Sequence, residues 1–88
     1  QKLQKDMMEA KEKINNMNFE GNSSFVTVVF NGNKELLNVK LDLSEIDSDD
    51  KEMLEDMIVV AVNDAMKKID DETEKTMGKY TQGMPGLF

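Results

Sequence analysis

The stretch from Asp50 to Lys68 constrains the fold most, because its pattern predicts a helix whose middle is apolar on almost every side. Its centre, Met57 to Val62, is a run of six apolar residues. One stripe has the i, i+4, i+7 spacing of an α-helical face and consists of Leu54, Ile58, Ala61, Ala65 and Ile69. Two further stripes flank it, namely Met53 with Met57 and Val60, and Val62 with Met66 and Ile69. The run is shorter than the ~20 apolar residues of a membrane span, so protein must cover it on more than one side.

A chain of 88 residues is one domain with a thin core, because a domain of this size buries only roughly 60–65% of its unfolded surface. Pairing with a second copy is a common remedy. We therefore expect a sheet of the same chain to cover one side of the long helix and a second copy to cover another, in a homodimer. The expected interface residues are Met57, Val59, Val60 and Asn63.

The composition argues against an enzyme. There is no Cys and no His, so thiol nucleophiles, imidazole bases and the usual transition-metal sites are missing. The stretch from Asp42 to Asp56 holds eight acids against Lys51 alone, which raises the alternative of a calcium loop. Counting Asp47 as the first ligand puts Glu52 where that loop requires a glycine. We expect no catalytic residue, metal or cofactor, and interpret the acids as partners of a helix start.

The charge limits how nucleic acid could be bound. The net charge is −7, from 18 acids and 11 bases, and every base is Lys. An acidic chain repels nucleic acid at long range, and the absence of Arg removes the commonest reader of guanine edges. Binding would therefore depend on local contacts between Lys and phosphate. The sequence shows no signal-peptide pattern and no membrane span, and the absence of Cys fits a cytoplasmic protein.

A first helix is predicted from Gln1 to Asn18, which carries four lysines against three acids. Its apolar seam has alternating spacings of four and three and consists of Leu3, Met7, Ala10, Ile14 and Met17. Two heptads are marginal alone, so this helix needs a partner. Its lysines could form an arm facing phosphates, or simply a solvated face.

Three strands follow the first helix. Phe19 to Ser24 is a candidate edge strand, Phe25 to Phe30 is rich in β-branched and aromatic residues, and Asn31-Gly32 favours a hairpin back into Glu35 to Asp42. If Phe30 pairs with Glu35, one face becomes the expected core, with Val26, Val28, Leu37, Val39 and Leu41. We expect the first helix to cover part of the other face.

The limits of the long helix follow from capping signals. Asp49 with Glu52 is the expected N-cap pair, with Ser48 as the alternative cap, and Gly78 is the expected stop. The expected organisation is one domain over residues 1–80 and a flexible tail over residues 81–88.

Together these segments resemble the YbaB/EbfC family of bacterial nucleoid-associated proteins. The resemblance rests on DKEMLEDMIVVAVNDAMKK and KTMGKYTQGMPGLF, and also on FEG, the VTVVFNGNKELLNVKLD hairpin and the helical start KLQKDMMEAKEKI. It implies an α+β subunit of α-β-β-β-α order, with a small antiparallel sheet and two helices, in an intertwined homodimer. It also implies binding to double-stranded DNA with little sequence preference, and association with recombination and replication genes. In the family, projecting helices carry the DNA contacts, which points here to Lys2, Lys5, Lys11, Lys13, Lys67, Lys68, Lys75 and Lys79.

Two functions remain open from the sequence. The first is a dimeric DNA-binding protein of the nucleoid that contacts phosphates through these lysines. The alternative is a non-enzymatic protein-interaction module associated with the recombination or replication machinery, which would use the acidic surface and the apolar tail. DNA binding measured at low and moderate salt separates the two.

Overall fold

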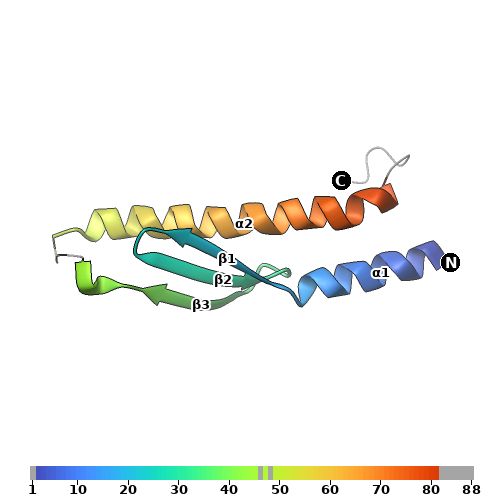
Figure 1. The fold of residues 1–88 in the computed structure, drawn as a ribbon, viewed down its shortest axis with the longest axis horizontal. Helices are drawn as coiled ribbons and strands as arrows, with labels where there is room; N and C mark the ends of the chain where they lie inside the picture. The colour runs from blue at the N-terminus through green and yellow to red at the C-terminus, as the bar shows by residue number, and fades with distance from the viewer. Residues whose placement is uncertain (1, 46, 48, 82–88) are drawn as a thin grey trace.

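The computed structural model describes residues 2–45, 47 and 49–81. Its elements are α1 (Lys2–Asn15), β1 (Asn18–Ser23), β2 (Val26–Asn31), β3 (Leu36–Leu41), the short 3-10 turn η1 (Leu43–Glu45) and α2 (Lys51–Thr81). The expected α-β-β-β-α order is thus confirmed. The Cα atoms extend over 57 × 22 × 14 Å, and α2 runs along the sheet and continues past it to lie beside α1 (Figure 1).

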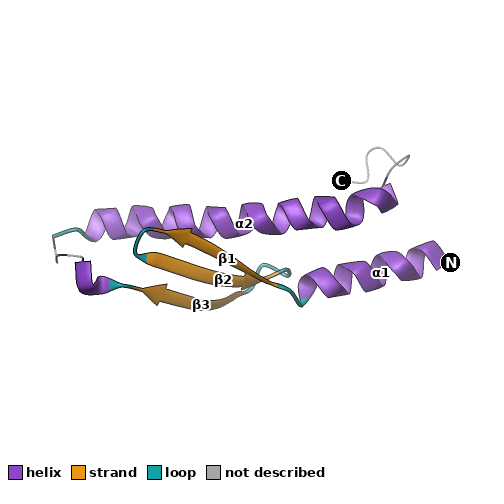
Figure 2. Cartoon of the chain, in the orientation of Figure 1, coloured by secondary structure: helices purple, strands orange, loops and turns teal. Residues whose placement is uncertain are grey.

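The three strands form one antiparallel sheet in the order β1-β2-β3 (Figure 2). The predicted pairing of Phe30 with Glu35 is wrong, because Phe30 lies opposite Leu36. A bulge then displaces the register further, so that Val28 pairs with Val39. The displacement from the predicted register is two residues at this point. Since side chains alternate with a period of two, Val39 and Leu41 keep the face predicted for them, whereas Leu36, opposite Phe30, moves onto that same face.

The turn between β2 and β3 explains the change in register. Asn31 Oδ1 accepts hydrogen bonds from the N–H groups of Asn33 at 2.9 Å and Glu35 at 3.0 Å. Lys34, between them, has a left-handed φ of 65°. An asparagine that bonds to the backbone following it makes a turn here that is one residue longer than the loop over residues 31–34 implied by pairing Phe30 with Glu35.

The helix α2 crosses the sheet over β1 and β2, and Gly21 of β1 lets it approach closely. A Cβ atom at Gly21 would collide with the carbonyl oxygen of Ala61 and would lie 2.9 Å from the Cβ of Ala65. The contact is possible because the facing residues are small, with Gly21 on the strand and Ala61 and Ala65 on the helix. The helix is therefore held over the first two strands.

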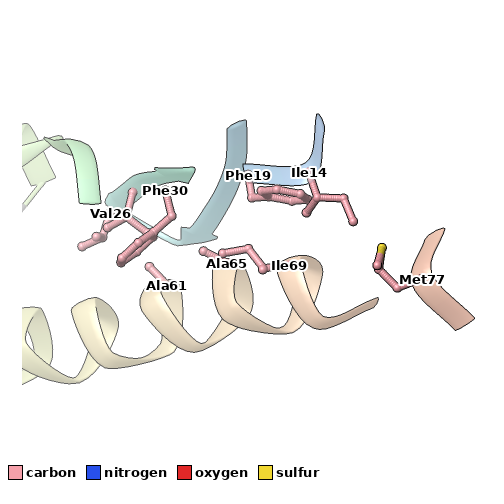
Figure 3. Packing of buried hydrophobic residues seen from close by; sticks show 9 residues of the cluster. Ile14, Phe19, Val26, Phe30, Ala61, Ala65, Ile69 and Met77 are labelled. Atoms are coloured by element: carbon pink, nitrogen blue, oxygen red, sulfur yellow. The ribbon is translucent and has the colours of Figure 1, made fainter. Parts of the chain in front are cut away.

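The hydrophobic core lies between α2 and these two strands. Its buried members are Ile14, Phe19, Val26, Val28, Phe30, Ala61, Ala65, Ile69 and Met77. Figure 3 shows Phe19 and Phe30 of the sheet lying opposite Ala61 and Ala65 of the helix. The stripe of α2 predicted from its periodicity is thus the stripe that meets the sheet.

The third strand lies outside this core, which corrects the prediction. Leu37, Val39 and Leu41 were expected among the core residues, but they are 53%, 44% and 39% exposed. The cause is geometric, because a helix about 10 Å wide covers roughly two strands spaced ~4.8 Å apart. With α2 held over Gly21, the apolar face of β3 stays open.

The first helix packs along the second half of α2, antiparallel to it (Figure 1). Ile14 is buried, and Met7 and Ala10 are partly buried against the core. The N–H of Gly32 donates to the carbonyl of Met17 at 3.1 Å and ties the end of α1 to the β2–β3 turn. The expectation that this helix covers the outer face of the sheet is wrong, because its apolar seam turns toward α2 instead.

Both predicted limits of the long helix need correction. The N–H of Leu54 donates to the carbonyl of Asp50 at 3.0 Å, which makes Asp50 the N-cap residue rather than Asp49. The alternative cap, Ser48, lies outside the described residues. The helix passes through Gly78 and continues to Thr81, since glycine weakens a helix but ends it only where the chain turns left-handed. Of the predicted tail, residues 82–88 lie outside the described residues.

Candidate nucleic-acid interface

The lysines of α1 are exposed and have no fixed acidic partner among the residues that the structure describes. Within the described part of the chain, none of them takes part in an ion pair; they are Lys2, Lys5, Lys11 and Lys13. An ammonium group without a fixed partner keeps its charge available to an external phosphate. The geometry of α1 is therefore compatible with the arm predicted from the sequence.

The lysines of α2 are in more varied surroundings. Lys67 Nζ lies 3.2 Å from Asp71 Oδ2 in an exposed i, i+4 pair. Because an exposed ion pair is weak, Lys67 is less available to phosphate than an unpaired lysine but can still bind it. Lys75 is exposed and makes no ion pair with the described residues. The side chain of Lys79 lies outside the description.

Lys68 contacts the sheet, which the sequence analysis did not foresee. Its Nζ donates to the carbonyl oxygen of Glu20 at 2.6 Å and lies 3.4 Å from Asp64 Oδ2. The same Asp64 oxygen accepts the N–H of Asn22 at 3.1 Å. Since β1 is an edge strand, these side chains satisfy backbone groups that have no neighbouring strand. We name Asp64 and Lys68 the β1 edge clamp; their i, i+4 spacing was the only signal in the sequence.

The clamp favours an ionised Asp64. The hydrogen bond from the Asn22 N–H holds the pKa of the Asp64 carboxyl below its ordinary value of 3.8, and the charge of Lys68 acts in the same direction. Just after β3, on the opposite edge of the sheet from β1, the hydroxyl and N–H of Ser44 lower the pKa of Asp42 in a similar way. Both carboxylates add fixed negative charge to the part of the molecule that holds the sheet.

Charge is unevenly distributed along the long axis. The acidic stretch from Asp42 to Asp56 lies at the connection into α2, whereas the start of α1 lies at the opposite end of the molecule (Figure 1). An anion approaching from the α1 end therefore meets the exposed lysines at a distance from most of these acids. That end is the more favourable side for phosphate.

The residues expected at a dimer interface are divided between the core and the surface. Met57 packs against the core, whereas Val59 and Val60 are 58% and 54% exposed and Asn63 is exposed. We define the open apolar surface as the exposed apolar residues of β3 and of the first half of α2: Leu36, Leu37, Val39, Leu41, Met53, Val59 and Val60.

A further lysine, Lys34, lies near α1 although it is distant from it in the sequence. Its Nζ is 3.8 Å from Asp70 Oδ1 of α2, and it lines the same groove as Lys11. Pattern reasoning missed it because only the folding of the β2–β3 turn against α1 brings it there.

These features define a small α+β protein with two packed helices that extend past a three-stranded sheet and carry exposed lysines. The chain belongs to the YbaB/EbfC DNA-binding family, whose sequence profile matches residues 1–84. The resemblance found in the sequence is thereby confirmed. Within the described residues, neither helix combines the length and apolar content needed to cross a bilayer.

Relatives and a solved structure agree with this assignment. The chain is 48% identical over 81 residues to a nucleoid-associated protein of Pediococcus pentosaceus, covering 90% of this chain and 78% of the relative. It is 43% identical over 89 aligned positions to a nucleoid-associated protein of Enterococcus faecalis, covering 99% and 86%. An uncharacterised protein of Helicobacter pylori matches with a TM-score of 0.73 and 25% identity over 88% of this chain and 83% of that one.

Proposed function

We propose that two copies of this chain form a nucleoid-associated dimer that binds double-stranded DNA through its phosphates. The observation that carries the proposal is the set of α1 lysines, exposed and without ion pairs among the described residues, at the end remote from the acidic stretch. The names of the relatives, which are nucleoid-associated proteins, support DNA as the ligand and the nucleoid as the location.

The mechanism we propose is electrostatic. Each lysine that neutralises a phosphate releases a condensed counterion, which gives affinity without reading the bases. Lysine is a point charge without the planar fork of arginine, and the chain has no Arg, so sequence preference should be weak. A dimer carries twice the charge of −7, so contact must be confined to the arms.

A second copy is the partner that fits the open apolar surface. Apolar residues exposed on β3 and on the first half of α2 indicate a surface that is covered in use. The β1 edge is closed by its clamp, whereas β3 offers an open edge and an apolar face. A dimer formed on this side would leave the lysine-bearing helices projecting from a shared centre.

A salt series of DNA binding tests the proposal. If ~4 lysines per dimer touch phosphates, log K should fall with log salt at a slope near −3.6. Two duplexes of unrelated sequence should bind with similar affinity. Binding that stays unchanged over a tenfold range of salt would contradict a mechanism driven by phosphate contacts.

The same salt series distinguishes DNA binding from the alternative function, a protein-interaction module. The acidic stretch and the open apolar surface also suit a protein-interaction module associated with recombination or replication. If folded dimers fail to bind either duplex even at low salt, this second function is favoured over DNA binding.

A further inference from the structure

The β2–β3 turn contains the one Asn-Gly step of the sequence, Asn31-Gly32. Asparagine is chemically labile before glycine, because glycine has no side chain to hinder attack by its own backbone nitrogen. Hydroxide takes the amide proton of Gly32, the nitrogen bonds to Cγ of Asn31, and Nδ2 leaves as ammonia with a proton from water. Water then opens the resulting succinimide at either carbonyl, which leaves aspartate or isoaspartate at position 31.

Both reacting groups are engaged in other bonds in the folded chain. The N–H of Gly32, the nucleophile, donates to the carbonyl of Met17 at 3.1 Å. The carboxamide of Asn31 is held at both ends, because Oδ1 accepts the N–H groups of Asn33 and Glu35 and Nδ2 donates to Glu35 Oε1 at 2.8 Å. Ring closure therefore requires that these bonds open first.

The end of α1 covers the nucleophile. A Cβ atom at Gly32 would collide with the carbonyl oxygen of Ile14 and would lie 3.0 Å from the Cα of Asn15. Figure 1 shows the turn beside this end of the helix. Ile14 is 4% exposed, so the contact belongs to the core. The backbone of Gly32 thus has little room to rotate while α1 stays docked.

We propose that Asn31 is a deamidation site that is closed while α1 is docked and opens when α1 lifts from the turn. α1 has fourteen residues, and Ile14 is the one that is buried. A short helix held by so little burial opens locally at a lower free energy than the whole domain unfolds. The site is separate from DNA binding, and its tests contain no DNA.

Deamidation also weakens the contact that kept the site closed. A carboxylate at position 31 has no Nδ2 to donate to Glu35 Oε1, and it places two negative charges at this contact. Isoaspartate in addition inserts the side-chain carbon into the main chain at the end of β2. The modified turn therefore holds α1 less firmly.

Peptide mass spectrometry of the full chain at mildly alkaline pH measures the rate at Asn31. The folded chain should react more slowly than the same chain unfolded in urea. Met7→Ala removes a partly buried contact of α1 with the core. It should raise the folded rate by roughly tenfold, which corresponds to about 1.4 kcal/mol of lost packing. The matched control is Met8→Ala, because Met8 is 67% exposed on the same helix and should leave the rate unchanged.

A second control separates the opening of α1 from global unfolding. Val26 is fully buried and begins β2, at the other end of the strand from Asn31. Val26→Ala should lower the urea midpoint but change the folded rate little. The proposal is overturned if the folded and unfolded chains react equally fast, if Met7→Ala has no effect, or if Val26→Ala accelerates the reaction as much as Met7→Ala does.

Hydrogen exchange tests the link to α1 without a substitution in the core. Asn31→Asp should lose amide protection over residues 2–15 while the protection of β1 stays the same. Adding Glu35→Gln returns a donor to the contact and should restore the protection of α1. Equal protection of α1 in Asn31→Asp and in the unsubstituted chain would overturn the coupling between the site and the helix.

Discussion

At the scale of single residues, the contact between Gly21 and α2 decides where the helix lies. A methyl group at this position meets backbone of the helix, which cannot move aside without shifting the whole element. The same residue therefore accounts both for the burial of β1 and β2 and for the exposure of β3.

Gly21→Ala should destabilise the fold by about 1–3 kcal/mol, the usual cost of overpacking a close contact. The measurement is urea unfolding followed by circular dichroism at one fixed protein concentration, because a dimer's stability depends on concentration. Gly78→Ala is the control: a Cβ there meets nothing within 4 Å, so alanine should stabilise α2 by about 0.5–1 kcal/mol. Equal effects of the two substitutions would contradict the role of Gly21.

The β1 edge clamp predicts a dependence of stability on pH. The folded-state pKa of Asp64 lies below its ordinary value of 3.8, so its contribution is present above that value and is lost as the pH falls through the folded pKa. Asp64→Asn should therefore lower the urea midpoint at pH 7 and give a shallower loss of stability on acidification. Asp71→Asn, which removes only an exposed pair with Lys67, should behave like the unsubstituted chain at both pH values.

At the scale of elements, the two helices differ in how they hold their lysines. Those of α1 are without ion pairs in the described structure, whereas Lys67 and Lys68 of α2 are engaged within the subunit. A substitution at Lys68 would weaken the β1 edge as well as remove a charge. The first helix therefore provides the cleaner test of DNA binding.

Replacing Lys2, Lys5 and Lys13 by Glu should weaken DNA binding while the dimer persists. If the ~4 phosphate contacts of the dimer come from these lysines, the salt slope should become shallower, from near −3.6 toward zero. Neutral replacements of Asp47, Asp49 and Glu52 should leave binding intact or strengthen it. The comparison requires variants shown by circular dichroism and sedimentation to be folded dimers. Wild-type affinity in the lysine variant would mean that α1 is not the contact.

At the scale of the whole molecule, the single chain leaves much of its apolar surface in water. The core covers one side of α2, and the open apolar surface extends over the other side and over β3. A small domain with this division of its apolar residues is typically completed by association. The dimer is thus the expected unit of function.

Val60→Asp or Val59→Asp should dissociate or unfold the dimer, because an unpaired charge buried in an interface costs several kcal/mol. Sedimentation at micromolar concentration measures the result. Met8→Asp is the matched control, since Met8 is 67% exposed on α1, away from the proposed interface. A stable, folded monomer of the unsubstituted chain would refute the obligate dimer.

The helices, the strands and their order could be predicted from the sequence, because they follow from local periodicity. The 3.6-residue stripe of Leu54 to Ile69 and the alternation in β2 depend only on neighbours along the chain. The faces of Val39 and Leu41 were also right despite an incorrect register, since a shift of two residues keeps a side chain on its face. The acidic start of α2 was recognised, although its cap lies at Asp50.

Only the tertiary structure decided which apolar residues form the core and what several lysines contact. Val39 and Val28 have the same pattern in the sequence, yet one is exposed and the other buried, because a single helix covers two strands and Gly21 holds it over β1. Lys68 and Lys75 look equivalent on a helical wheel, but Lys68 alone reaches the carbonyl of Glu20. These differences arise from distances between segments far apart in the chain, which no local pattern encodes.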